Sequence, residues 1–287
     1  VEYKRIYKSI KQELGWRKLQ SLEPVILQKV LNDLKSDNQR KKVKIILSDI
    51  LEKAMRNDLL IKNPAKHLIT QIDNEYPKRR RVLSVQETEL FLEYSKECKY
   101  YNLFVVALET GMRIGELKAL NWDDIDFSKR ALWVKRTMCL VRDDHGSYFE
   151  IHTPKTFYGN RMIPLTSKCV EALMRQKKIN IPIVKKYKNV KFENLVFPSR
   201  SNTPLYETVI IRAIHITLTK MNEDGIHIEK FSPHTFRHTF ATRAIENGMN
   251  PKVLQQIMGH GTLQMTMDLY CHVFDETLFG EMKKMEK

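Results

Sequence analysis

The residues with the clearest chemical potential lie in the segment His234-Thr-Phe-Arg237-His238-Thr-Phe-Ala-Thr. Ser232-Pro233 comes directly before it, a pair typical of a helix N-terminus. His234 and Arg237 are three residues apart and therefore share one face of that helix. An imidazole and a guanidinium near the positive end of a helix suit an anion, phosphate in particular. A capped helix with a surface arginine and no ligand is the alternative interpretation.

Two other segments carry residues of the same kind. Met258-Gly-His260-Gly places a histidine between two glycines, where the backbone is exposed and can approach a ligand closely. Tyr270 follows ten residues later, although by its type alone it would more often be a core aromatic. Upstream, Arg113 follows a glycine break, and Glu116 lies one turn further on, where it could brace the guanidinium.

A metal site is a weaker interpretation of the same residues. His234 and His238 are four residues apart and could share a metal ion. No third ligand and no HExxH pattern accompanies them, so we expect no metal.

Taken together, the segments resemble the motifs of the tyrosine recombinase family of phage and conjugative-transposon integrases. The order and spacing match as well: 23 residues separate Arg237 from His260, and 10 separate His260 from Tyr270. The resemblance spans about residues 80–275, and its last part, Tyr270-Cys-His-Val-Phe274, looks most like the conjugative-transposon and Gram-positive phage branch. The matching pieces are Thr110-Gly-Met-Arg113-Ile-Gly-Glu116-Leu, Thr153-Pro-Lys155-Thr with Arg161-Met-Ile-Pro164-Leu, the His234–Thr242 segment, and Met258-Gly-His260 leading to Tyr270.

This resemblance implies a site-specific recombinase that cuts and rejoins DNA through a 3′-phosphotyrosine and a Holliday junction, without a cofactor. Tyr270 is then the nucleophile. Arg113 and Arg237 clamp the nonbridging oxygens of the phosphate, and His260 is a third donor. Guanidiniums are always charged and can bind the phosphate oxygens in this way without a metal ion.

The resemblance assigns the remaining roles to three residues. Because an unperturbed tyrosine has a pKa of about 10, Tyr270 needs a proton acceptor, and His234 fits that role. Lys155 is the general acid that protonates the departing 5′-oxygen. Glu116 orients Arg113 from behind.

The chain that must position these residues has 287 residues, 49 Lys+Arg and 34 Asp+Glu, with a net charge of +15. Its length predicts roughly two domains, and 42% hydrophobic with 29% charged residues excludes general disorder. It has neither a signal peptide nor an apolar run near the roughly 18 residues of a membrane span. Four scattered cysteines form no zinc or disulfide pattern, so we expect a reduced, cytoplasmic protein. Val1 in place of a starting methionine is consistent with a truncated N-terminus.

The positive charge is concentrated near the N-terminus. Residues 1–81 contain 20 Lys+Arg and 10 Asp+Glu, a net charge of +10, whereas residues 82–287 have a net charge of only +5. This asymmetry predicts a polyanion-binding part, although solubility alone is the alternative. The candidate DNA contacts are Lys41, Lys42 and Lys44, which open a predicted helix, and Lys78, Arg79, Arg80 and Arg81 in a linker.

Apolar periodicity and capping signals predict a multi-domain chain. An all-α core-binding domain covers residues 1–72, a basic linker 73–83, and a mainly α catalytic domain with a small antiparallel β-sheet (α+β) 84–287. In the first domain, Ser21 caps a helix with Pro24 in its first turn, and a second helix runs from about Arg40 toward Asn63-Pro64. In the second, Ser84 and Glu87 form a capping box; further helices are expected at 103–109, 114–120, 168–178, 207–221, 232–248 and 251–258, and strands at 132–136, 148–152 and 161–165, the last two flanking a turn at Gly159-Asn160.

The resemblance also implies an assembly: a clamp around double-stranded DNA and a homo-tetramer on two recombination sites, with no membrane association. A C-terminal helix around Glu276–Glu286 would dock onto a neighbouring protomer, or otherwise onto its own domain. Two alternatives stay open. A type IB topoisomerase-like enzyme would relax DNA with the same residues, and a non-catalytic DNA-binding protein would need only the basic first 81 residues.

Overall fold

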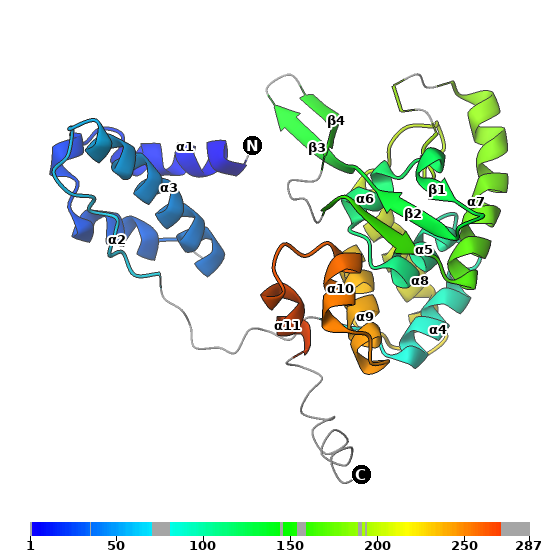
Figure 1. Ribbon diagram of the computed structural model, residues 1–287. Helices are drawn as coiled ribbons and strands as arrows, with labels where there is room; N and C mark the ends of the chain where they lie inside the picture. The colour runs from blue at the N-terminus through cyan, green and yellow to red at the C-terminus, as the bar shows by residue number, and fades with distance from the viewer. Residues whose placement is uncertain are drawn as a thin grey trace, which may run out of the picture. The chain divides into compact units, whose positions relative to one another are not determined.

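The computed structural model describes residues 2–34, 36–70, 81–143, 146–153, 159–188, 191–192 and 194–270 (Figure 1). The chain divides into two compact units, residues 1–79 and 80–287. The division falls within the stretch 73–83 that we interpret as a basic linker. The expected fold class is confirmed: within the described residues the first unit has helices and no strand, and the second is mainly helical with small antiparallel sheets.

The first unit consists of three helices around one apolar core. Leu27 and Leu31 from the second helix meet Leu47 and Leu51 from the third in that core. The elements are α1 (Glu2–Leu14), the 3-10 turn η1 (Leu19–Ser21), α2 (Pro24–Asn32) and α3 (Asp37–Arg56).

Two predictions about where helices start in this unit are wrong in detail. Ser21 does not cap α2, because it closes η1 and its Oγ donates to the carbonyl of Lys18 at 2.8 Å, while Glu23 precedes the helix. The third helix begins at Asp37 rather than near Arg40, because the side chain of Ser36 accepts the N–H of Gln39 as its N-cap.

The earlier start of α3 changes the setting of its lysines. Lys41, Lys42 and Lys44 lie in the second turn instead of opening the helix. The influence of the helix dipole falls off within the first turn, so these charges do not oppose it there. The helix also ends sooner than expected, at Arg56.

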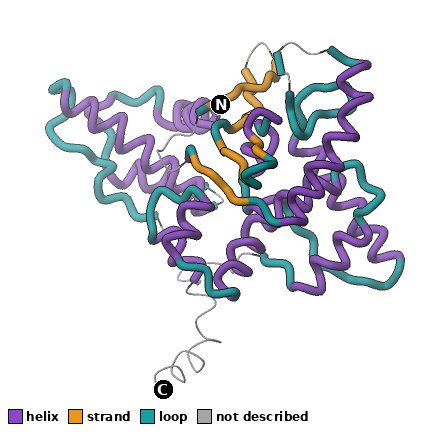
Figure 2. The backbone as a smooth tube through the Cα atoms, turned by 45° about the vertical axis from the view of Figure 1, so that its right-hand side comes forward, coloured by secondary structure: helices purple, strands orange, loops and turns teal. Residues whose placement is uncertain are grey.

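The second unit packs helices against two small sheets. A cluster of rings, Phe91, Phe104, Phe231 and Phe236, with centroids 5.2–5.8 Å apart, lies within its core. Figure 2 shows the strands grouped together within a largely helical unit. The helices are α4 (Val85–Tyr94), α5 (Tyr101–Thr110), α6 (Ile114–Ala119), the 3-10 turn η2 (Trp122–Asp124), α7 (Ser167–Lys186), α8 (Glu207–Glu223), α9 (Pro233–Glu246), α10 (Pro251–Met258) and α11 (Gln264–Tyr270).

The strands pair differently from the prediction. Strands β1 (Ile125–Asp126), β2 (Ala131–Val134) and β5 (Arg161–Pro164) form one antiparallel sheet, and β3 (Thr137–Asp143) pairs with β4 (Gly146–His152) in another. The strands expected on either side of Gly159-Asn160 therefore belong to different sheets. Strand β3 was not predicted, because its residues show no clean alternation of apolar and polar side chains.

The elements that carry the motif residues gather at one place. Helix α5 packs against α9, α10 packs against both α9 and β5, and α11 packs against α9 and α10. Figure 1 shows α9, α10 and α11 as one cluster beside the sheet. At the end of α5, Gly111 takes a left-handed conformation with φ +60°, which turns the chain into α6. This turn delivers Arg113 to the same cluster.

Candidate active site

Arg113 is held in place by the carboxylate of Glu116 at the start of α6. The backbone N–H of Arg113 donates to Glu116 Oε2 at 2.9 Å, and its Nη1 donates to Oε1 at 3.0 Å. The Arg113 side chain is 38% exposed, whereas Glu116 is 5% exposed. The sequence prediction that Glu116 lies behind Arg113 agrees with this geometry.

Arg161, at the start of β5, contacts the same carboxylate from the other side. Its Nη1 and Nη2 donate to the two oxygens of Glu116 at 3.0 and 2.8 Å, a two-pronged ion pair in which each side chain is 5% exposed. We assigned Arg161 no role from the sequence, although it lies within one of the quoted motifs. The signal that could have revealed it is the strand pattern, because Arg161 lies on the same inward face as the buried Ile163.

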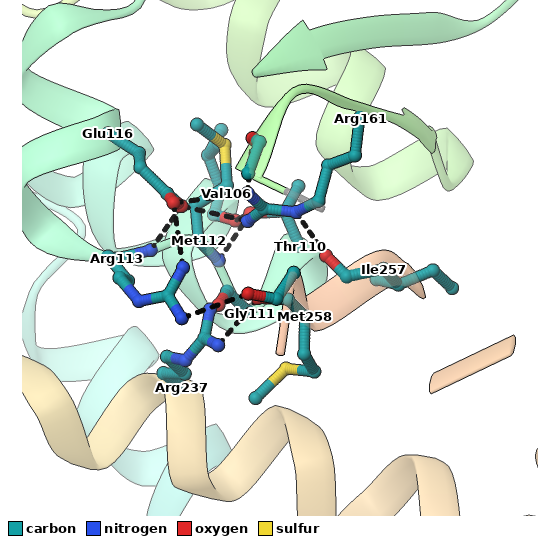
Figure 3. Close-up of polar contacts among 12 residues, drawn as sticks. Val106, Thr110, Gly111, Met112, Arg113, Glu116, Arg161, Arg237, Ile257 and Met258 are labelled. Atoms are coloured by element: carbon teal, nitrogen blue, oxygen red, sulfur yellow. Dashed lines mark hydrogen bonds and ion pairs between the residues drawn. The ribbon is translucent and has the colours of Figure 1, made fainter. Parts of the chain in front are cut away.

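The C-terminal end of α10 positions all three arginines. Three consecutive carbonyls there have no partner within the helix, and each accepts a hydrogen bond from a different guanidinium. Arg161 donates to Ile257 at 2.6 Å, Arg237 to Met258 at 2.6 Å, and Arg113 to Gly259 at 3.2 Å. Figure 3 shows the three arginines converging on this helix end, and Arg113 and Arg161 also contacting Glu116. Arginines favour this location because a helix C-terminus carries partial negative charge.

Arg237 also spans to the end of α5. Its Nη1 donates to the carbonyl of Gly111 at 2.7 Å while Nη2 holds Met258, so one guanidinium ties two helix ends together. Among the described residues, Arg113 and Arg237 each use two of their five N–H donors, and three remain on each side chain. These donors are suited to the oxygens of a phosphate.

The electrostatics of the cluster favour an anion. Burial lowers the pKa of Arg237 to about 9; the charges of Arg113 and Arg161 act in the same direction, and Glu116 opposes them. Burial acts to raise the pKa of Glu116, but hydrogen bonds and charges from Arg161 and Arg113 outweigh it, so the pKa lies below its usual value. Three cations against one carboxylate leave an excess of positive charge that a bound phosphate would relieve.

The two histidines occupy different environments. His260 is buried, follows the carbonyl cluster directly, and its Nδ1 lies 2.8 Å from Thr266 Oγ1 on α11. His234 is exposed on the first turn of α9, the helix that carries Arg237. Tyr270 is the last residue of α11, the helix packed against α9 and α10. The structure thus places Arg113, Arg237 and His260 together, with Tyr270 on a neighbouring element.

Several candidate residues lie outside this cluster or outside the described residues. Lys155, Lys78, Arg79 and Arg80 belong to segments that the structure does not describe, as does the predicted C-terminal helix 276–286.

The candidate DNA contacts that are described differ in how far they are engaged within the chain. Arg81 pairs with Glu87 and Glu229, and Lys44 donates to the carbonyl of Leu68 at 2.5 Å. Lys42 is partly buried, and Lys41 is exposed.

In the part of the chain that the structure describes, no group of three or more His, Cys, Asp or Glu side chains is placed to hold a metal ion. None of the helices there combines the length and the apolar character that crossing a membrane requires.

The solved structures that share this fold include integrases. A fragment of the Tn1549 transposon integrase in complex with a circular intermediate DNA superposes with a TM-score of 0.82 at 27% identity, covering 99% of this chain and 92% of that one. The lambda integrase tetramer bound to a Holliday junction matches with a TM-score of 0.63 at 19% identity, covering 93% of this chain and 70% of that one, which shows the fold alone.

Sequence comparison specifies the family. The transposase from transposon Tn916 of Enterococcus faecalis is 31% identical over 248 residues, 82% of this chain and 58% of that protein. A tyrosine recombinase XerC-like protein of Caldanaerobacter subterraneus subsp. tengcongensis is 29% identical over 293 residues, 95% of this chain and 73% of that protein. The phage integrase family model matches residues 81–277. The chain therefore belongs to the phage integrase family, and it spans 58% of the length of the Tn916 transposase.

Proposed function

We propose that this chain is the DNA-cutting and rejoining part of a site-specific recombinase that integrates and excises a mobile element. The observation that supports it most is the cluster in which Arg113 and Arg237, each with free N–H donors, are held next to His260 at the end of α10. Membership of the phage integrase family and likeness to transposon integrases bound to DNA point to the same activity.

The reaction assigns one step to each residue. The hydroxyl oxygen of Tyr270 bonds to the scissile phosphorus, and its proton passes to His234. The bond from phosphorus to the 5′-oxygen breaks, and Lys155 protonates that oxygen. Arg113, Arg237 and His260 stabilise the charge that develops on the nonbridging oxygens. A 5′-hydroxyl from a second strand then attacks the 3′-phosphotyrosine and releases Tyr270.

The partners follow from the same proposal. The substrate is double-stranded DNA with two recombination sites, on which four copies of the chain assemble in the cytoplasm. Residues 276–286 dock onto a neighbouring copy. The lambda integrase relative was solved as a tetramer on a Holliday junction, which supports this arrangement. The first unit, the linker 73–83 and the exposed Lys41 hold the DNA backbone.

A covalent-capture assay tests the proposal. In nicked duplexes that carry the ends of the element, cleavage releases the short fragment that bears the free 5′-hydroxyl, so the strand cannot be rejoined. A covalent protein–DNA adduct therefore accumulates and is resolved on a denaturing gel. We expect an adduct with the parent chain and none with Tyr270→Phe, while both bind the duplex equally in a gel shift. An adduct-free parent that still binds DNA would instead support a non-catalytic DNA-binding protein, and adducts that yield only relaxed circles would support the topoisomerase-like alternative.

A further inference from the structure

Arg161 makes more hydrogen bonds than either arginine assigned to the phosphate. Its Nε donates to Ile257, its Nη1 to Glu116 and to the carbonyl of Gly159 at 3.2 Å, and its Nη2 to Glu116. Four of its five N–H groups are thus engaged, and its side chain is 5% exposed. Arg161 therefore has little capacity left to contact DNA, and any effect it has on the reaction must pass through the groups it holds.

The first of those groups is the carboxylate of Glu116, which Arg161 shares equally with Arg113. Glu116 Oε1 accepts Nη1 of both arginines at 3.0 Å. Oε2 accepts the backbone N–H of Arg113 at 2.9 Å and Nη2 of Arg161 at 2.8 Å. Each carboxylate oxygen thus accepts from both residues, and Figure 3 shows both guanidiniums reaching the carboxylate of Glu116.

This sharing decides the charge that Arg113 offers to a phosphate. Without Arg161, Glu116 and Arg113 would form a one-to-one ion pair with no net charge. With Arg161 present, two guanidiniums face one carboxylate, and Arg237 adds a third cation nearby. The positive charge that remains is the charge needed opposite the developing negative charge of a transferring phosphoryl group.

The second group that Arg161 holds is the end of α10. It fixes the carbonyl of Ile257, and the next two carbonyls fix Arg237 and Arg113. His260 follows immediately and is itself buried. One side chain on β5 therefore sets the position of the peptide segment that carries the other contacts.

From this geometry we propose that Arg161 is a positioning residue of the strand-transfer site. Arg161 pairs with the Glu116 carboxylate and anchors the end of α10. As a result, Arg113 keeps its positive charge and its free N–H donors for the scissile phosphate. This inference rests on the proposed function, because it concerns the same reaction.

The test compares two nicked substrates in the covalent-capture assay, using the full chain. One carries the ordinary scissile phosphodiester; in the other, a methylphosphonate replaces it, so that a methyl group stands where one charged oxygen was. We expect Arg161→Met to slow capture on the phosphodiester by about 100-fold, the size of effect seen when one charge-stabilising group is lost. On the uncharged methylphosphonate we expect Arg161→Met and the parent to react within a few-fold of each other.

A matched control separates positioning from folding. Arg136→Met breaks another ion pair with a buried carboxylate in the same unit, that with Asp124, and should leave the ratio of the two substrate rates unchanged. If Arg161→Met is slowed equally on both substrates, or behaves like Arg136→Met, the proposal is wrong.

A second variant covers the case in which Arg161→Met does not fold. Replacing both partners, in Arg161→Met with Glu116→Met, removes the buried charges together and is expected to be tolerated better than either single change. Since the carboxylate that Arg161 offsets is then absent, Arg113 keeps its positive charge, and the ratio of the rates on the two substrates should stay within a few-fold of the parent's ratio. A double variant whose phosphodiester rate falls about 100-fold relative to its methylphosphonate rate overturns the proposal. A parent that forms no adduct with either substrate would instead refute the proposed function.

Discussion

At the scale of single residues, the buried carboxylate of Glu116 depends on its hydrogen-bond donors to remain charged. An ionised carboxylate that is 5% exposed loses nearly all of its hydration, which costs several kcal/mol. Four N–H donors from Arg113 and Arg161 replace the lost water. The charged form is stable in the folded chain because of these donors, and removing the carboxylate would leave Arg161 buried without its ion-pair partner.

Glu116→Gln should therefore lower the free energy of unfolding by about 3–5 kcal/mol at neutral pH. The pKa of a glutamate in an unfolded chain is about 4.3, and the pKa of Glu116 in the folded chain lies below its usual value. The ionised carboxylate thus contributes its full stabilisation at a pH above the pKa in the unfolded chain. This stabilisation is lost as the pH falls through the pKa in the folded chain. The charged groups that face Glu116 are the guanidiniums of Arg113, Arg161 and Arg237.

Urea unfolding of the parent and of Glu116→Gln, followed from about pH 7 down to about pH 3, measures this difference directly. All other carboxylates titrate in both proteins, so the difference between the two isolates Glu116. We expect the difference to be constant above about pH 5 and to shrink below it. A difference that does not change with pH would show that the pKa of Glu116 is the same in the folded and the unfolded chain, and would contradict the expected lowering.

At the scale of elements, the site is built from helix ends. The C-termini of α5 and α10 both close with a glycine in the left-handed conformation, Gly111 at φ +60° and Gly259 at φ +62°. Each end leaves carbonyls without helical partners, and the arginines bind those carbonyls. A change in either helix end should therefore alter the position of a guanidinium.

Gly111→Ala tests this relation. A Cβ at this position would press against the ring of Phe240 and lie 3.0 Å from Met258 Sδ. A positive φ costs a non-glycine residue about 1–2 kcal/mol, and overpacking adds about 1–3 kcal/mol. We expect thermal unfolding to show both losses, and covalent capture to fall further than binding, because the carbonyl that holds Arg237 moves.

Gly248→Ala is the control for backbone conformation. Gly248 has φ +74°, and a Cβ there would have nothing within 4 Å. It should lose only the conformational part of the stability and retain normal capture. Equal effects of the two substitutions on capture would contradict a role for the end of α5 in placing Arg237.

The sequence predicted those parts of the elements that depend on local signals. The capping box of Ser84 and Glu87, the glycine end of α5 and the bounds of α10 all follow from neighbouring residues, and all are confirmed. The pairing of β2 with β5 and the contacts of Arg161 with Glu116 and Ile257 join residues more than 25 positions apart. A one-dimensional pattern contains no information on such register, so these features were missed or misplaced.

At the scale of the whole molecule, the two units have separate cores and unequal charge. Leu27 and Leu51 belong to the core of the first unit, and Phe91 and Phe236 to that of the second. The net charge of +10 in residues 1–81 lies mainly in the first unit. Many of these cations are exposed, but the described ones are not equally free, because some are already engaged within the chain.

Lys41 and Arg81 should therefore differ in how they affect DNA binding. Each cation that neutralises a phosphate releases counterions, so it contributes about 0.9 to the slope of log K against log salt. Lys41 is exposed, whereas Arg81 is paired with Glu87 and Glu229. We expect Lys41→Gln to reduce the slope by about 0.9 and to weaken binding equally on all DNA sequences, because a phosphate contact reads no bases.

Arg81→Gln should leave the slope unchanged, and its effect should instead be a loss of stability at the start of α4, where Glu87 belongs to the capping box. Fluorescence anisotropy on a labelled duplex over a series of salt concentrations measures both slopes, and thermal unfolding measures the stability. A reduced slope for Arg81→Gln would mean that DNA displaces Glu87 and Glu229 from Arg81, and an unchanged slope for Lys41→Gln would remove Lys41 from the DNA-contacting surface.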